Sequence, residues 1–320
     1  MKTVQFTSVQ RILGALLREE TNLRGYLRPI VLSVCILALV GATYSKAFAE
    51  TDNINTSISV RENKVLLREP IQIEVSMKNI SNETQGIKPI KPSVAMISRN
   101  GDPQQKFHLF ETWREQISDI GIGPIEVQPG NELLENYWLL LGRTSLRDDW
   151  EFLFPKPGHY TVSFPDYGDE DVKFDVVSAS DTDDISAGQI FSVASAAVFL
   201  GEEQRKDKEK GVEDLQTICS KHASGKYAPY AALALARHLW REEGNATFDL
   251  QKYYKYVDVI IEKHPAHYLS DKAYYMRAKG LNKEGKKDRV VECLDALRKQ
   301  HPKSKYARII ESEFEVKKRK

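Results

Sequence analysis

The sequence predicts an all-β region followed by an all-α region of helical repeats, with an export signal in front of both. Short segments between residues 50 and 178 alternate apolar and polar side chains, as strands with one buried face do. Between residues 212 and 316, one helical pattern recurs at intervals of 42 and 37 residues, a period typical of stacked helix pairs. The length of 320 residues suits two domains.

Residues 1–49 have the order of features found in secretory signal peptides. Basic residues outnumber acidic ones in residues 1–28, residues 30–41 are almost wholly apolar, and residues 47–49 have the Ala-x-Ala form of a cleavage site. The apolar run is shorter than the roughly 20 residues of a membrane-spanning helix. We therefore expect cleavage after Ala49, export to the periplasm or the extracellular space, and no stable membrane insertion afterwards. The alternative is a membrane anchor that is retained.

Charge balance and motifs argue against several classes of function. The chain has 46 Lys and Arg against 45 Asp and Glu, so we expect no nucleic-acid partner. It has no nucleophile-elbow, phosphate-loop or nucleotide-binding motif, so we expect no enzyme and no cofactor. An enzyme of unrecognised type remains a third hypothesis. His264 and His267 are the nearest approach to a metal-ligand pair, but they lack a third ligand at a suitable spacing, so we expect no metal site.

Residues 50–178 are predicted to form an antiparallel β-sandwich. Apolar and polar side chains alternate in residues 71–78, 160–164 and 172–176, and turn sequences such as Pro157-Gly158 separate these segments. Several short strands spaced in this way are typical of a sandwich.

Three phrases in this region are similar to bacterial immunoglobulin-like domains. They are EPIQIEVSMKNIS at residues 69–81, EVQPGNEL at 126–133 and FLFPKPGHYTVSF at 152–164, the last with the Pro-Gly-x-Tyr turn that leads into the final strands of such domains. The resemblance implies an immunoglobulin-like sandwich that binds, spaces or stiffens. The Cys-Trp-Cys spacing of antibody domains is missing, which excludes that subclass.

Two short polar segments flank the helical region. Residues 179–184 are small or acidic and have no large apolar side chain, which predicts a linker between the two domains. Residues 317–320 form a basic tail, Lys-Lys-Arg-Lys, that we expect to be a frayed and solvated end. The helical region itself is expected to cover residues 185–316.

The helical pattern can be measured from His222, His264 and His301. Four, seven and ten residues before each histidine stands an apolar or aromatic side chain, which places one apolar stripe on a helix. Serines in the intervening segments, including Ser304, can cap the helices that follow. Seven helices are predicted, near residues 187–202, 207–221, 227–243, 249–263, 270–284, 286–300 and 303–316.

These units resemble divergent tetratricopeptide repeats of bacterial envelope proteins. Leu235 and Ala236 fall on the family's Leu-Gly pair, Leu239 on its first aromatic position and Pro265 on its closing proline. The units exceed the usual length of about 34 residues, and Tyr253 stands where a small residue is usual. The resemblance implies an α-α solenoid in which the first helix of each pair lines a concave groove. Carried onto this chain, the groove residues are Tyr230, Leu233, Arg237, Trp240, Lys272, Tyr275, Lys279 and Asn282.

The sequence therefore predicts a non-catalytic scaffold that recognises a protein or peptide through this groove. Aromatic side chains supply contact area and cations supply charge-assisted bonds, a combination that suits an acidic segment or a carboxylate. The same side chains can also be explained as helix packing and a solvated face. In the alternative function, the sandwich is the active module, similar to a protease inhibitor or binding a glycan through loops near Trp113, Trp138 or Trp150, and the helices are a spacer.

Overall fold

A computed structural model describes residues 53–87, 92–110, 124–167, 171–201, 206–241, 243 and 248–314. The chain divides into two units, and the second one, Ile54–Lys320, contains nearly all of the described residues. The predicted signal peptide, residues 1–49, and the basic tail, residues 317–320, lie outside the described residues, and both remain predictions.

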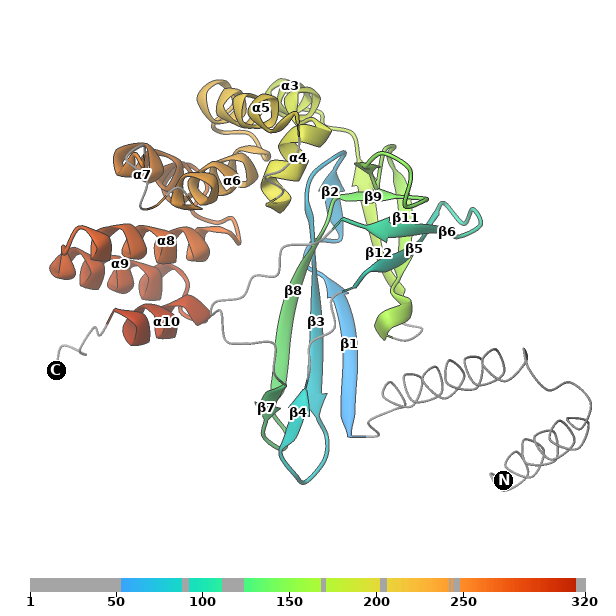
Figure 1. Ribbon diagram of the computed structural model, residues 1–320, viewed down its shortest axis with the longest axis horizontal. Helices are drawn as coiled ribbons and strands as arrows, with labels where there is room; N and C mark the ends of the chain where they lie inside the picture. The colour runs from blue at the N-terminus through green and yellow to red at the C-terminus, as the bar shows by residue number, and fades with distance from the viewer. Residues whose placement is uncertain are drawn as a thin grey trace, which may run out of the picture. The chain divides into compact units, whose positions relative to one another are not determined.

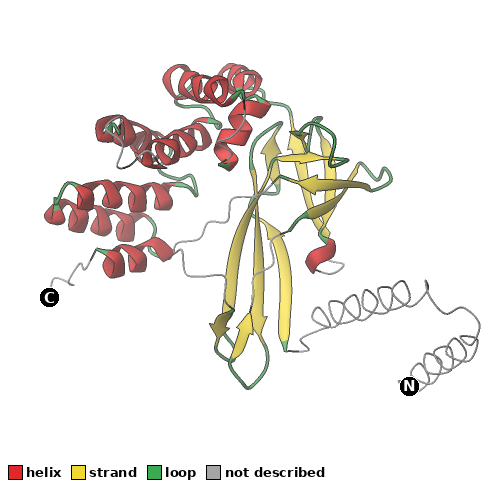
Figure 2. Ribbon diagram, in the orientation of Figure 1, coloured by secondary structure: helices red, strands yellow, loops and turns green. Residues whose placement is uncertain are grey.

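The second unit begins with a β region, a half-barrel sheet with smaller sheets beside it, and continues as a helical domain of eight packed helices. Figure 2 shows the strands and the long helices as separate parts of the chain, and Figure 1 shows that they follow one another in sequence. The predicted order of an all-β region followed by an all-α region is confirmed at this level.

One small sheet is a three-stranded antiparallel ribbon. Strand β3 (Ile71–Asn79) lies between β1 (Ile54–Val60) and β8 (Glu132–Leu139), and two short strands, β4 (Gln85–Ile87) and β7 (Ile125–Val127), pair separately. The alternating apolar side chains of β3 are buried, as its sequence pattern predicts.

The larger sheet has seven strands. All its pairs are antiparallel except one, because β2 (Lys64–Leu66) runs parallel to β12 (Asp171–Val177). The prediction of a purely antiparallel region is wrong at this pair. The parallel pair arises because the segment between β1 and β3 leaves the three-stranded sheet and joins the edge of the seven-stranded sheet. There the Leu67 amide donates to the Val177 carbonyl at 2.9 Å. The strand order is β10 (Glu151–Phe152), β9 (Leu141–Arg143), β6 (Gln105–Leu109), β5 (Val94–Arg99), β11 (Gly158–Ser163), β12 (Asp171–Val177) and β2 (Lys64–Leu66).

From α4 (Val193–Leu200) onward the helices stack in chain order, each against its sequence neighbour, whereas α3 (Thr182–Ile190) packs against α5 (Lys208–Lys221) (Figure 1). Helix α7 (Leu250–Asp258) continues into a π-helical turn, Val259–Lys263. The eight helices are α3 (Thr182–Ile190), α4 (Val193–Leu200), α5 (Lys208–Lys221), α6 (Ala228–Arg241), α7 (Leu250–Asp258), α8 (Ser270–Lys283), α9 (Lys287–Gln300) and α10 (Lys305–Glu313).

The first predicted helix, residues 187–202, is in fact two helices. Ser192 interrupts it as the N-cap of α4, because its hydroxyl accepts from the Ser195 amide at 3.2 Å while Ser195 bonds back to the Ser192 amide. Upstream, Asp181 caps α3, so residues 182–184 of the predicted linker form the first turn of that helix. Ser304 caps α10, as predicted.

The apolar core of the helical domain extends into one end of the β region, whose remaining buried side chains form a separate core of their own. The indole of Trp138, at the end of β8, is 1% exposed and lies 5.0 Å from the ring of Phe199 and 6.1 Å from that of Tyr230, centroid to centroid. The Tyr227 hydroxyl donates to the carbonyl of Leu67, which joins the start of α6 to the β region. None of the described helices is long and apolar enough to cross a lipid bilayer.

Candidate functional site

The predicted groove residues divide into a buried half and a half-exposed half. Tyr230, Leu233 and Arg237, on α6, are buried, and so is Lys272 on α8. Tyr230 packs against Trp138 of the β region, so this end of the helical face is covered by the protein's own strands.

The other half begins on α6 and continues along α8. Trp240, Tyr275, Lys279 and Asn282 are all half-buried. The Lys279 ammonium lies 4.5 Å from the centroid of the Trp240 ring. Tyr275 and Lys279 are four residues apart, which places them on one side of α8.

Further cation and ring contacts extend this half-exposed surface. Phe248 packs edge-on against Trp240 at 5.7 Å, and the Lys283 ammonium lies 5.5 Å from the Phe248 ring centroid. Lys283 also pairs with Glu243 at 2.7 Å. We name the five residues Trp240, Phe248, Tyr275, Lys279 and Lys283 the aromatic strip.

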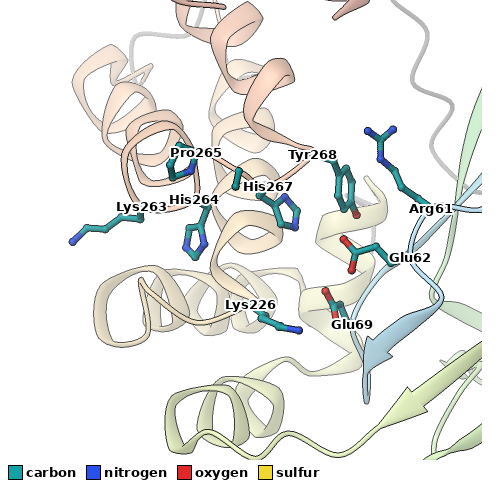
Figure 3. A pocket seen from close by; sticks show the side chains of 10 residues that line it. Arg61, Glu62, Glu69, Lys226, Lys263, His264, Pro265, His267 and Tyr268 are labelled. Atoms are coloured by element: carbon teal, nitrogen blue, oxygen red, sulfur yellow. The ribbon is translucent and has the colours of Figure 1, made fainter. Parts of the chain in front are cut away.

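A pocket lies where the β region meets the turns of the helical domain (Figure 3). Its cavity volume is about 560 Å³, within the range of small-molecule sites. One wall comes from the segment between β1 and β3, and the others come from the turn before α6 and the turn before α8. We name it the junction pocket; its lining residues are Arg61, Glu62, Glu69, Lys226, Lys263, His264, Pro265, Ala266, His267 and Tyr268.

Glu69 forms the buried end of the junction pocket and is only 4% exposed. Its Oε2 accepts from the Leu66 amide at 2.7 Å and its Oε1 accepts from the Tyr230 hydroxyl at 2.9 Å. The Tyr268 hydroxyl donates in turn to the Tyr230 hydroxyl at 3.1 Å. Burial raises the pKa of Glu69 to about 7, and the negative charge of Glu62 adds to the rise. Glu69 therefore exchanges its proton near neutral pH.

Both histidines of the junction pocket are neutral near pH 7. Burial lowers the pKa of His264, and it lowers the pKa of His267 to about 3. The Nδ1 atom of His267 accepts from the Leu269 amide at 3.2 Å, which places the proton of the neutral ring on Nε2. The ring stacks on Tyr268 with centroids 4.4 Å apart. No group of three or more potential metal ligands occurs among the described residues.

The cations of the junction pocket are exposed and make no ion pair with a described carboxylate. The Arg61 guanidinium lies 5.0 Å from the centroid of the Tyr268 ring. The backbone of Lys226 is held by a bond from its amide to Asp184 Oδ1 at 2.6 Å. In Figure 3 the Lys226 ammonium is directed toward Glu69, whereas Lys263 points away.

Sequence reasoning singled out His264 and His267 but missed their neighbours from the β region. Arg61, Glu62 and Glu69 stand about 200 residues earlier, and no motif relates the two segments. One signal was available for Glu69, because it stands two residues before a strand, β3, whose inward face is apolar.

The three tryptophans named for the alternative function, in which the β region is the binding module, lie in different surroundings. Trp138 is buried in the apolar core of the helical domain, and Trp113 lies outside the described residues. Trp150 is half-buried, with the Phe110 ring 4.7 Å away and the Arg143 guanidinium 4.3 Å from its ring centroid.

Comparison with known proteins yields distant structural likenesses. No protein-family model matches the chain, and no curated protein does. The Pseudomonas fluorescens alkylpurine DNA glycosylase AlkC, bound to DNA containing an abasic site analog, aligns over 40% of this chain and 31% of its own, at 11% identity and a TM-score of 0.23. A β-glucosidase from Listeria innocua aligns over 38% of this chain and 16% of its own, at 13% identity and a TM-score of 0.20. This chain thus spans less than a third of either protein, and likenesses this weak carry no argument about fold or activity.

Proposed function

We propose that the protein is a non-catalytic binding scaffold whose helical region recognises an acidic segment of a protein or peptide. The observation that carries the proposal is the aromatic strip, where Lys279 and Lys283 lie over the rings of Trp240 and Phe248. Cations held on aromatic rings combine contact area with positive charge at little further loss of side-chain entropy.

The Glu243 and Lys283 pair supports an acidic partner. The Glu243 carboxylate forms an ion pair with the Lys283 ammonium of the aromatic strip at 2.7 Å. The strip thus already binds one carboxylate of the protein itself. Lys279 makes no ion pair with a described carboxylate and is available for a second one. An Asp or Glu of the partner would form an ion pair with Lys279, of the same kind as the pair between Glu243 and Lys283.

We also propose a fold type for each of the two regions and a location for the protein. An immunoglobulin-like sandwich in residues 50–178 and a tetratricopeptide-like solenoid in residues 185–316, joined near residues 179–184, would suit a recognition role. Export would follow from the signal-like residues 1–49 and would place the protein in the periplasm or outside the cell.

Selection from a random phage-displayed peptide library on the wild-type protein tests this function. We expect the selected peptides to be rich in Asp and Glu. We expect the double variant Trp240→Ala, Lys279→Ala to bind them at least about tenfold more weakly, the loss that one charge-assisted contact of about 1.4 kcal/mol represents.

Lys287→Ala is the matched control, because Lys287 is an exposed cation on the neighbouring helix α9. Circular dichroism of all variants verifies folding. Selected peptides without acidic enrichment, or peptides that bind the double variant as tightly as the wild type, would refute the proposal.

A further inference from the structure

Beyond the aromatic strip, we infer that the junction pocket binds a small zwitterion of the α-amino-acid class, with its ammonium group at Glu62 and Glu69 and its carboxylate at Lys226. Figure 3 shows the two carboxylates and the Lys226 ammonium directed into the same space, beside the rings of His267 and Tyr268. A cavity of about 560 Å³ has room for any such ligand.

The two glutamates create a place for a positive charge. Glu62 makes no ion pair with a described cation, and its negative charge adds to the rise in the pKa of Glu69 that burial causes. An ammonium group between two carboxylates removes this repulsion and is attracted by both. His264 and His267 are neutral and do not repel it.

Lys226 supplies the opposite charge. Its ammonium is exposed and unpaired among the described side chains, while its backbone is fixed by Asp184 at the turn before α6. The Arg61 guanidinium on the Tyr268 ring adds positive potential at the rim. A ligand that carries both charges close together therefore matches the pocket better than a simple anion or a simple cation.

Binding of the zwitterion is linked to the proton on Glu69. The charged groups around this carboxyl are Glu62 and Arg61 from the β region and Lys226 from the turn before α6; its polar neighbours are Tyr230, Tyr268 and the neutral His267. An ammonium ligand favours the ionised carboxylate. Because Glu69 exchanges its proton near pH 7, affinity rises as the pH is raised from 6 to 8.

A thermal-shift screen of the twenty common α-amino acids on the whole protein, followed by calorimetry of the best one, tests the inference. The N-acetyl derivative of that amino acid lacks the ammonium group and the amide derivative lacks the carboxylate. We expect each derivative to bind at least about tenfold more weakly than the parent.

Pocket variants locate the two contacts. Glu62→Gln should reduce the preference for the parent over the N-acetyl derivative, because only Glu69 is then left to pair with the ammonium group, and Lys226→Ala should erase the preference over the amide. Glu69→Gln should remove the rise of affinity between pH 6 and 8. Glu126→Gln and Lys252→Ala are matched controls, because both residues are exposed and lie on other elements, β7 and α7.

Several results would overturn the inference. They are a screen without any binder, equal binding of the parent and both derivatives, and unchanged binding in Glu62→Gln and Lys226→Ala. Neither Glu62 nor Lys226 is buried, so both variants are expected to fold, and their melting temperatures without ligand verify this.

Discussion

Burial decides the protonation states at the junction pocket. Glu69, His264 and His267 would carry their ordinary charges on an exposed loop, but removal from water disfavours the charged form of each. A carboxyl group therefore keeps its proton up to about pH 7, and the two imidazoles stay neutral at a lower pH than exposed histidines would.

Glu69 makes stability depend on pH in a defined direction. Its folded pKa, about 7, lies above the ordinary value of 4.5, so its contribution is fully present below pH 4.5 and is lost as the pH rises through 7. We expect the free energy of unfolding of the wild type to fall, relative to Glu69→Gln, by up to about 3 kcal/mol between pH 4.5 and 8. Urea unfolding of both proteins across this range measures the difference. A constant difference would mean that Glu69 does not titrate with a raised pKa.

At the scale of elements, the close contact of α4 and α5 depends on one missing side chain. A Cβ atom on Gly211 would lie 2.5 Å from the carbonyl oxygen of Ala194. That oxygen belongs to the backbone of α4, which cannot rotate away, and seven of the eight residues of α4 are buried. The two helices therefore pack backbone to backbone at this point.

Gly211→Ala should destabilise the protein even though alanine is the better helix former. Alanine gains about 1 kcal/mol in helix propensity, but the contact with Ala194 forces α4 and α5 apart. We expect a net loss of about 1–3 kcal/mol in urea unfolding. Glu209→Ala, at an exposed site in the first turn of α5, is the control and should change stability by less than about 0.5 kcal/mol. A Gly211→Ala protein as stable as the wild type would contradict the close contact.

At the scale of the molecule, the apolar core of the helical domain joins the β region to the helices. Trp138 comes from a strand but has Phe199, Tyr230 and Tyr268 as ring neighbours, all from the helical domain. Tyr227 and Tyr230 reach back to hydrogen-bond acceptors at Leu67 and Glu69. We therefore expect the two regions to unfold in one cooperative transition.

Trp138→Ala tests this cooperativity. The cavity should lower the free energy of unfolding by about 3–5 kcal/mol, and the loss should be felt equally in both regions. Hydrogen exchange followed by mass spectrometry on peptides from β12 and from α6 measures it region by region. Leu134→Ala, at a side chain on the same strand that is 45% exposed, is the control. Destabilisation confined to one region would show that the two unfold independently.

The helices and strands were predictable because their signals are local. The apolar stripe before His222, His264 and His301 is a property of the chain alone, and α5 and α9 end one residue before two of these histidines. The break at Ser192 was missed because serine is compatible with a helix interior as well as with a cap.

The candidate sites depended on contacts that no local pattern encodes. The residues of the predicted groove lie on the expected helices, but Tyr230 and Trp240, on the same helix, differ in exposure because a β strand covers the first. The junction pocket was invisible in the sequence for the same reason.

The sequence by itself determined the classes of structure, their order and the residues on each helical face, because hydrophobic periodicity requires only neighbours along the chain. Only the tertiary structure decided which face is covered, which carboxyl keeps its proton and where residues 61–69 meet residues 264–268. Exposure and pKa depend on desolvation by segments distant in the chain, and those segments come together only when the whole core packs.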